Sequence, residues 1–278
     1  MLIDTHLHLV DRGQLSYPWL ADVPALDRDW SYEAYDTVAR RVGISGTLHM
    51  EVDVEEGCIG QETNMVEQLM SRPGSLIRGA IASGRPEAAD FAAYLENLDG
   101  NVVKGLRRVL HVVPDEVSQA PLFRENIRRL ATRALTFDIC MLQRQLPLAA
   151  TLADAAPDVI FVLDHCGVPD MSAESFGDWK EKISELAKRP NLNIKISGIV
   201  AYTGGDFTLE RLRPYVEHAI GAFGWNRVVW GSDSPVCTLG GANLETWVAA
   251  TYALTLGCSK DERAAFFSEN ARRIWQLD

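Results

Sequence analysis

The sequence predicts a single-domain (β/α)8 barrel of the TIM type. Eight short runs of apolar, strand-favouring residues recur along the chain, and each is followed by a longer stretch with helical periodicity. This alternation is typical of βαβ units around a parallel sheet. The length of 278 residues is close to the roughly 250 that such a barrel takes. No change in composition divides the chain, so we expect one domain over residues 1–278.

The predicted strands are short and largely apolar, as expected for strands that are covered on both faces. They are Leu2–Thr5, Gly46–Val52, Leu76–Ala82, Val102–Arg107, Phe137–Leu142, Val159–Leu163, Leu192–Ser197 and Arg227–Gly231. Eight strands in this order favour a closed barrel over an open, doubly wound sheet.

Several of the intervening stretches begin with a residue that favours a helix start. These are Ser31 before a helix that closes at Gly43, Pro121 before Leu122–Leu135, Thr208 before Leu209–Phe223, and Ser259 with Glu262 before a helix that runs through Trp275. The last pair has the Ser-x-x-Glu spacing of a capping box.

The segment from Val10 to Trp30 is long for a βα loop. It contains Tyr17-Pro18-Trp19-Leu20 and several aspartates. Either it folds over the barrel mouth, or it is a surface connection whose Trp19 packs on the barrel rim.

The composition excludes several classes of protein. A formal net charge of −11 disfavours a nucleic-acid binder, because such proteins cluster Lys and Arg against phosphates. Five scattered cysteines without a CxxC pair favour a reducing cytoplasm. The sequence has no signal-peptide pattern and no run of 18 apolar residues, so we expect a cytoplasmic protein without a membrane span. Whether the chain forms a homo-oligomer is left open.

Polar residues follow several predicted strands, at the end of the barrel where active sites of this fold lie. His6 and His8 are two residues apart, so alternation along a strand turns both imidazoles to one face. Such a pair can bind a zinc-like ion or donate hydrogen bonds to a polarised carbonyl. Alternatively, both histidines bind the backbone or a carboxylate at a strand edge.

Asp233 and His165 are the candidate catalytic residues. Asp233 follows an apolar strand and lies between small residues, where a carboxylate could bind a metal or act as a general base on water. The alternative is an Asp that caps the next turn. His165 ends a buried strand, and we expect it rather than its neighbour Asp164 to face the barrel mouth.

Further polar residues are candidates for substrate binding. Arg107 could bind a carboxylate or a developing oxyanion at two points, and Lys104 is a second candidate cation. The two are three positions apart, so only one of them faces the mouth. Glu51, Gln143 and Trp19 complete the set, the first two being equally explained as hydrogen-bonding residues of the barrel rim.

Motifs for other chemistries are missing. The sequence has no GxSxG elbow, P-loop, GxGxxG fingerprint or HExxH helix. The chain therefore lacks the motifs that serine esterases, NTPases, dinucleotide-binding enzymes and zincins require.

Six motifs, taken together, resemble a known family. They are IDTHLHLVD (Ile3–Asp11), YPWL (Tyr17–Leu20), VKGLRRVLH (Val103–His111), FVLDHCGVPD (Phe161–Asp170), NIKISG (Asn193–Gly198) and VVWGSDSPV (Val228–Val236). In this order they resemble the amidohydrolase-related family of the amidohydrolase superfamily. Within it they resemble the lactonase branch, which includes L-fuconolactonase, L-rhamnonolactonase and 2-pyrone-4,6-dicarboxylate lactonase. The likeness spans nearly the whole chain.

The resemblance implies hydrolysis of a small sugar lactone or carboxylated lactone. It implies that His6, His8 and His165 hold or polarise the lactone carbonyl, that Asp233 activates water, and that Arg107 binds oxygen-rich parts of the substrate. These roles agree with what ester opening needs, a positioned water, a base and a stabilised oxyanion.

The sequence departs from the metal-dependent members of this superfamily, which take a ligand from a middle strand. The predicted fifth strand ends at Leu142, followed by Gln143, and offers no histidine. We therefore expect either no cofactor or one divalent ion, preferably zinc, held by His6, His8 and Asp233 with Glu51 as a further candidate. Two other functions stay open, a decarboxylase or hydratase of the same barrel family and a non-catalytic barrel that binds a small molecule.

Overall fold

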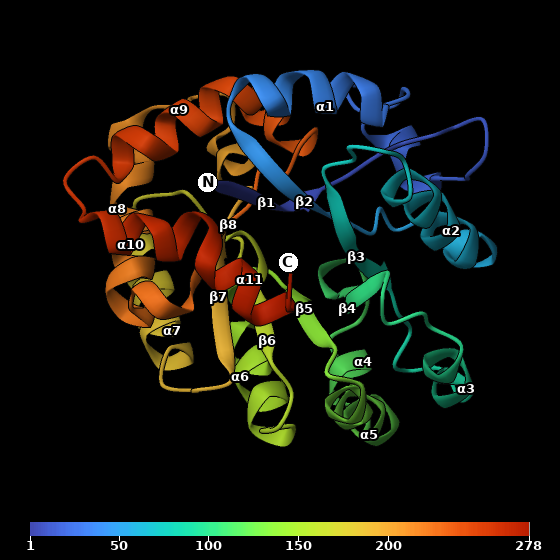
Figure 1. The fold of residues 1–278 in the computed structure, drawn as a ribbon. Helices are drawn as coiled ribbons and strands as arrows, with labels where there is room; N and C mark the ends of the chain where they lie inside the picture. Colours follow the sequence, from blue (N-terminus) through green and yellow to red (C-terminus); the bar gives the residue numbers. More distant parts are fainter. Residues whose placement is uncertain (278) are drawn as a thin grey trace.

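Eight parallel strands form one sheet in the order β1 to β8 in the computed structural model, which describes residues 1–277 (Figure 1). The strands are β1 (Leu2–Leu7), β2 (Ile44–Met50), β3 (Ile77–Ser83), β4 (Val103–Val109), β5 (Thr136–Cys140), β6 (Phe161–Leu163), β7 (Leu192–Ile196) and β8 (Val228–Trp230). β8 returns to β1, where the Thr5 hydroxyl donates to the Trp230 carbonyl and Leu7 bridges Ser234. The predicted (β/α)8 barrel is confirmed.

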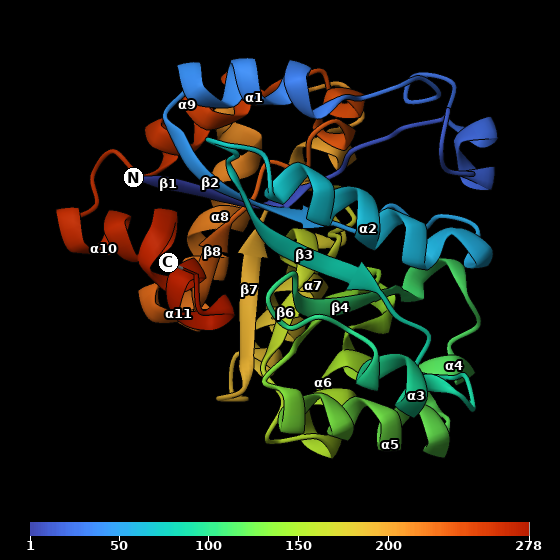
Figure 2. The ribbon, with the colours of Figure 1, turned by 45° about the vertical axis from the view of Figure 1, so that its right-hand side comes forward.

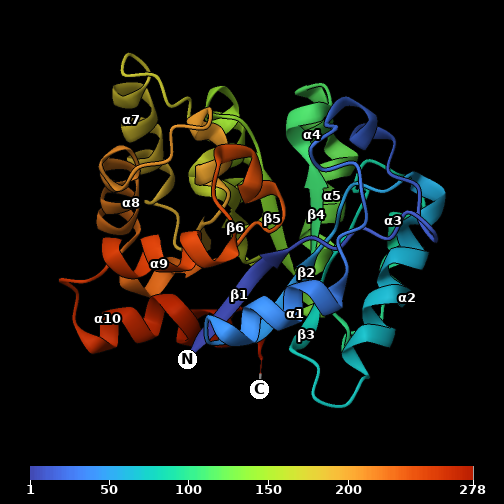
Figure 3. The same cartoon turned by 90° about the horizontal axis from the view of Figure 1, so that it is seen from above.

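Helices follow the strands and surround the barrel (Figures 1 and 3). They are α1 (Tyr32–Arg41), α2 (Ile59–Met70), α3 (Phe91–Glu96), α4 (Glu116–Gln119), α5 (Pro121–Arg129), α6 (Leu146–Ala155), α7 (Phe176–Leu186), α8 (Leu209–Phe223), α9 (Leu244–Leu254), α10 (Lys260–Ala264) and α11 (Asn270–Trp275). Among the described residues, no helix combines the length and apolar character needed to cross a bilayer.

The predicted helix starts are confirmed. The side chains of Ser31 and Thr208 cap α1 and α8, and Ser259 forms a reciprocal capping box with Glu262 at α10. Two predicted helices are less regular than expected. The helix after Pro121 tightens into a 3-10 turn at Leu130–Arg133, and the last helix contains a π turn at Ala265–Glu269.

One end of the barrel is closed by the C-terminal helix. Trp275 and Ile274 of α11 pack against interior side chains such as Ile3 and Leu48, and the Trp275 indole donates to the Thr136 hydroxyl at 3.0 Å. Figure 2 shows α11 and the N-terminus together at this end, where the strands begin. The polar residues that follow the strands lie at the opposite end.

The Val10–Trp30 segment covers that opposite end. Its two ends pair through antiparallel backbone hydrogen bonds between Val10 and Trp30. Leu20 and Leu26 form an apolar cluster with Val52, which follows β2. Figure 2 shows the segment, in dark blue, beyond the ends toward which β1 and β3 point. Of the two interpretations offered above, the segment folds over the mouth.

Candidate active site

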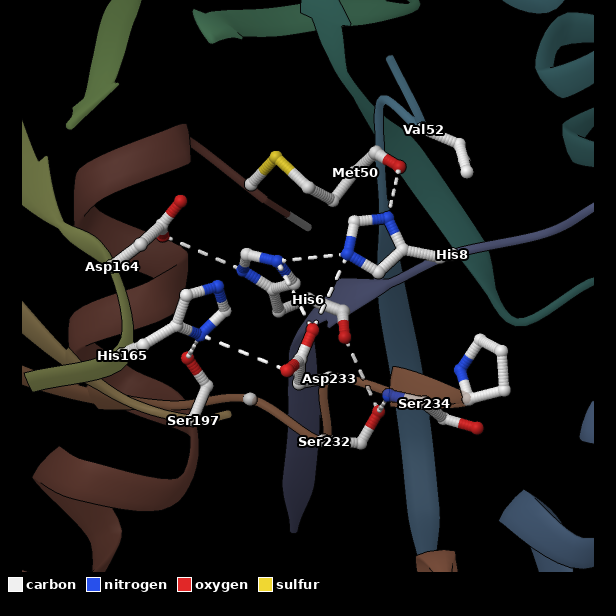
Figure 4. Close-up of polar contacts among 12 residues, drawn as sticks. His6, His8, Met50, Val52, Asp164, His165, Ser197, Ser232, Asp233 and Ser234 are labelled. Atoms are coloured by element: carbon white, nitrogen blue, oxygen red, sulfur yellow. Dashed lines mark hydrogen bonds and ion pairs between the residues drawn. The ribbon is translucent and has the colours of Figure 1, made fainter. Parts of the chain in front are cut away.

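His6 and His8 lie side by side at the end of β1. Their Nε2 atoms are 3.2 Å apart, as expected from side chains on one face of a strand (Figure 4). β1 carries an extra residue between Asp4 and Leu7 relative to β2, so strict alternation is interrupted just before the pair. His6 is fully buried, and His8 above it lines a cavity.

The Nδ1 atoms of both rings, which point away from the His6–His8 contact, lie close to other groups. His8 Nδ1 lies 3.0 Å from the Met50 carbonyl, which accepts its proton. His6 Nδ1 lies 3.4 Å from Asp164 Oδ1 and 3.3 Å from Lys195 Nζ, so it can donate to the carboxylate or accept from the ammonium. Burial, opposed by Asp164, lowers the pKa of His6 well below its usual value. The Nε2 lone pair of His8 is thereby left for a group near Asp233, and that of His6 is left as well when Nδ1 donates to Asp164.

Asp233 follows β8 and faces these histidines. Its Oδ1 is 3.3 Å from His8 Nε2 and 3.6 Å from His6 Nε2, and its backbone is left-handed with φ of 53°. Within residues 1–277, neither buried carboxylate oxygen of Asp233 has a hydrogen-bond partner. Such groups are rare in folded proteins, so this carboxylate is placed to accept from a ligand, a water or a cation.

His165 reaches the same place through a strained turn. Its φ of 54° is left-handed, as is that of Cys166, and its Nδ1 lies 3.0 Å from the Ser197 hydroxyl and 3.9 Å from Asp233 Oδ2. Strain of this kind concentrates at functional sites. The turn also corrects one prediction: Asp164 does not face away from the interior, because the backbone leaves the extended conformation after it and both side chains point inward.

Gly198 permits this approach. A Cβ at this residue would collide with the His165 ring and lie 2.6 Å from Asp233 Oδ2. The residue also has a left-handed φ of 53°. Glycine is therefore required here by space as well as by backbone conformation.

Lys195 and Asp138 form an ion pair beneath the histidines that sequence reasoning missed. Lys195 Nζ lies 2.5 Å from Asp138 and 3.0 Å from Asp164, and all three side chains are fully buried. Burial alone would raise the pKa of Asp164, but Lys195 and His6 outweigh it and hold that pKa well below the usual value. Asp164 therefore stays a carboxylate that can orient His6.

Arg107 comes from β4, and Glu51 holds it. Its Nε donates to Glu51 Oε1 at 2.6 Å and its Nη2 to the Glu51 carbonyl at 2.7 Å, while Nη1 lies 3.3 Å from His6 Nε2. Glu51 is fully buried and does not line the cavity. It is thus a positioning residue for Arg107, which is the hydrogen-bonding alternative that the sequence left open, and not part of the cavity lining.

Two predicted binding residues lie elsewhere. Lys104 points away from the interior, and its Nζ contacts the Gly100 carbonyl at 3.2 Å, because it is three positions from the inward Arg107. Gln143 is turned toward α7, where its amide donates to Asp178 at 2.8 Å. Neither lines the cavity, whereas Trp19 does.

The fifth strand ends in Cys140, two residues before the predicted Leu142. Cys140 Sγ lies 3.2 Å from His111 Nδ1, and both residues line the cavity. Burial raises the pKa of the Cys140 thiol and lowers the pKa of His111 to about 4. At neutral pH the pair is therefore a neutral thiol and a neutral imidazole.

A cavity of about 210 Å³ lies above these side chains. His8, Arg107, His165 and Asp233 line its floor, and His6 lies directly beneath. A concave, mostly apolar pocket with a few convergent polar groups is what small-molecule sites share.

The donor set fits a single divalent ion. The Nε2 atoms of His6 and His8 and Asp233 Oδ1 are 3.2, 3.3 and 3.6 Å from one another. These separations are close to the roughly 3.3–3.6 Å edge of a tetrahedron with zinc bonds of about 2.0–2.2 Å. Arg107 Nη1 contacts the same His6 nitrogen, so this nitrogen either accepts from Arg107 or binds an ion.

A parallel barrel with histidines and an aspartate at the strand ends has the groups to hold a metal ion or a water beside a bound substrate. The chain belongs to the amidohydrolase family, whose sequence model matches residues 3–277. It is an enzyme of this family, and the resemblance seen in the sequence is confirmed.

Three relatives illustrate the match. The chain is 28% identical to the uncharacterized protein y4mH of Sinorhizobium fredii, covering 99% of this chain and 98% of that one. It is 26% identical to the L-fucono-1,5-lactonase of Burkholderia ambifaria, covering 99% and 96%. A crystal structure of an amidohydrolase from Burkholderia multivorans with bound zinc superposes with a TM-score of 0.91 at 23% identity, covering all of both chains.

Proposed function

We propose that this protein hydrolyses a small lactone by attack of water on the ring carbonyl, with Asp233 as the general base. The observation that carries the proposal is the buried carboxylate of Asp233, which has no hydrogen-bond partner among residues 1–277 and lies at the floor of a small cavity beside three histidines. A base in this position needs only a water between it and the substrate carbonyl. The lactonase named among the relatives supports the same reaction.

In the attack step, Asp233 takes a proton from water while the water oxygen bonds to the carbonyl carbon. Charge then develops on the carbonyl oxygen. His8 and Arg107 line the floor, and the guanidinium can stabilise that charge without reorganising, because Glu51 already fixes its plane.

In the second step the bond between the carbonyl carbon and the ring oxygen breaks. The ring oxygen must receive a proton as it leaves. His165 lines the cavity with Nδ1 3.9 Å from Asp233 Oδ2, so it can receive the proton from the carboxylate through one water and pass it to the leaving oxygen. The product is a hydroxy acid, and Asp233 is again free to act as a base.

A divalent ion, zinc by preference, would be held by His6, His8 and Asp233. Bound there, it would polarise the carbonyl or lower the pKa of the attacking water. The groups that would orient these histidine ligands are already in place, since Asp164 contacts Nδ1 of His6 and the Met50 carbonyl accepts from Nδ1 of His8.

The test is acid release from a panel of lactones by the purified protein, with and without a chelator. The panel includes the sugar and carboxylated lactones that the resemblance implies, together with unsubstituted rings. Opening of at least one class at a rate that depends on enzyme concentration supports the proposal. No release from any lactone overturns it and favours the decarboxylase or hydratase alternative.

A further inference from the structure

The wall of the cavity above the catalytic floor is apolar. Seven aliphatic side chains form it, contributed by four separate parts of the chain: Val10, Leu20, Leu26, Val52, Val109, Val112 and Val236. Most of them belong to the cluster that holds the Val10–Trp30 segment over the mouth. Val112 is 61% exposed although it lines the cavity, so an apolar surface is kept open at the rim.

Two polar groups of the wall are already bonded to the protein, and Tyr202 adds a hydroxyl to the lining. Trp19 Nε1 donates to the Val52 carbonyl at 2.8 Å, and Asp53 pairs with Arg85 at 3.2 Å. A sugar lactone carries a hydroxyl on most ring carbons, and each hydroxyl buried without a partner weakens binding by about 5- to 160-fold. Because the wall is mostly aliphatic and Tyr202 brings its one hydroxyl, it disfavours a ring that carries several hydroxyls.

The wall also lacks a cation for a carboxylate. Among residues 1–277, Arg107 is the only Lys or Arg that lines the cavity, and Glu51 already binds it. Arg108, the next residue along the chain, pairs with Glu87 at 2.8 Å. Asp233 adds negative charge to the lining, whereas Asp53 is balanced by Arg85. A carboxylated lactone would thus enter without a free cationic partner and against the Asp233 carboxylate.

Resting on the proposed function, we infer that the substrate is a monocyclic lactone with an apolar alkyl or aryl substituent. The ester group lies on the polar floor, and the substituent contacts the wall under the Val10–Trp30 segment. A cavity of about 150 Å³ suffices for benzene. The 210 Å³ here therefore accepts one six-membered ring with a short chain.

The experiment compares δ-lactones that differ only in what the ring carries. The values of kcat/KM are measured for δ-valerolactone, δ-hexalactone and δ-octalactone, and for L-fucono-1,5-lactone and D-glucono-1,5-lactone. Burial of each added carbon raises kcat/KM about fourfold, hence roughly sixtyfold from δ-valerolactone to δ-octalactone. Both hydroxylated lactones fall below δ-octalactone. A hydroxylated lactone that exceeds δ-octalactone overturns this inference and leaves the proposed function intact.

A binding measurement separates the two proposals if no lactone is opened. Calorimetry on the wild-type protein uses 6-propyl-piperidin-2-one, unsubstituted piperidin-2-one and a trihydroxylated piperidin-2-one, which carry the same ring but resist hydrolysis. Tighter binding of the propyl compound by at least tenfold supports the apolar pocket whatever the reaction. Equal or tighter binding of the hydroxylated compound contradicts it.

Substitutions in the wall test the location of the pocket. Val236→Thr and Val112→Thr keep the side-chain shape but replace one methyl group with a hydroxyl. Each lowers the ratio of kcat/KM between δ-octalactone and δ-valerolactone about 3- to 10-fold. Val113→Thr is the matched control, because Val113 is adjacent in sequence but does not line the cavity, and its ratio stays within twofold. Unchanged ratios in both wall variants would place the substituent elsewhere and overturn the inference.

Discussion

The ammonium group of Lys195 lies 3.0 Å from Asp164, with both side chains sealed inside the barrel. Asp164 in turn faces Nδ1 of His6, and Nε2 of the same ring faces Asp233. A buried charge on β7 is thus linked through two side chains to the carboxylate that we propose as the base. On the other side, the Lys195 ammonium lies 5.5 Å from the ring of Trp275, so it joins the reactive end of the barrel to its closed end.

Replacing Lys195 by Met should destabilise the fold strongly. It leaves Asp138 and Asp164 buried without their counter-charge, a change that costs about 3–5 kcal/mol. Urea unfolding measures this, with the exposed Lys188→Met as control, expected within about 0.5 kcal/mol of wild type.

If Lys195→Met does not fold, the double variant Lys195→Met/Asp138→Leu tests whether the lost counter-charge is the cause. Removing both charges of the closest pair should restore part of the stability. A single variant as stable as wild type would show that this ion pair does not matter to the fold.

Asp164→Asn should weaken zinc binding. The carboxylate orients His6 through its Nδ1, and loss of such a partner typically costs 10- to 100-fold in metal affinity. Competition with a chromophoric chelator measures the Kd, and Asp154→Asn on the surface is the control. Equal affinities in wild type and Asp164→Asn would exclude this role, and a wild-type protein without measurable zinc affinity would contradict the metal site itself.

His49 should make the fold less stable in mild acid. Burial, followed by His8 and Arg107, lowers the pKa of His49 from 6.5 to about 3. The unfolded chain therefore binds the extra proton between these values, and the contribution to stability is full above pH 6.5 and decreases as the pH falls toward 3. His49→Gln should reduce the loss of unfolding free energy between pH 7 and pH 5 by about 2 kcal/mol. An unchanged loss would contradict a buried neutral His49.

Gly198→Ala should impair catalysis through His165 and Asp233. The added methyl group displaces one or both side chains, and a misplacement of about 1 Å can cost roughly 100-fold in kcat. Gly204→Ala is a matched control, since Gly204 is also left-handed, with φ of 66°, but has open space at its Cβ position. Comparable activity losses in the two variants would trace the effect to backbone strain instead of the site.

The fold could be predicted because buried parallel strands are apolar and their helices start with recognisable caps. The same alternation correctly placed His6 and His8 on one face and separated Arg107 from Lys104. It failed at His165, where the left-handed turn follows from packing against residues distant in sequence. A rule based on neighbours along the chain cannot detect such a turn.

Lys195 and Asp138 were missed although the sequence carried a signal. Around Lys195, the residues Asn193, Lys195 and Ser197 alternate with Leu192, Ile194 and Ile196. In a strand of a parallel barrel, this pattern turns a polar stripe toward the interior. Asp138 lies between Phe137 and Ile139 in the same way. What the sequence could not provide is the pairing of these two charges, because it depends on the closure of the barrel.

The most direct test of the account is the kcat of Asp233→Asn on the lactone that wild type opens fastest. Asparagine keeps the size of the side chain but cannot accept a proton from water. We predict that kcat falls by about 10²- to 10⁴-fold, the range for loss of a general base, while circular dichroism and the melting temperature stay close to wild type. A folded Asp233→Asn protein that turns over at the wild-type rate would contradict the mechanism.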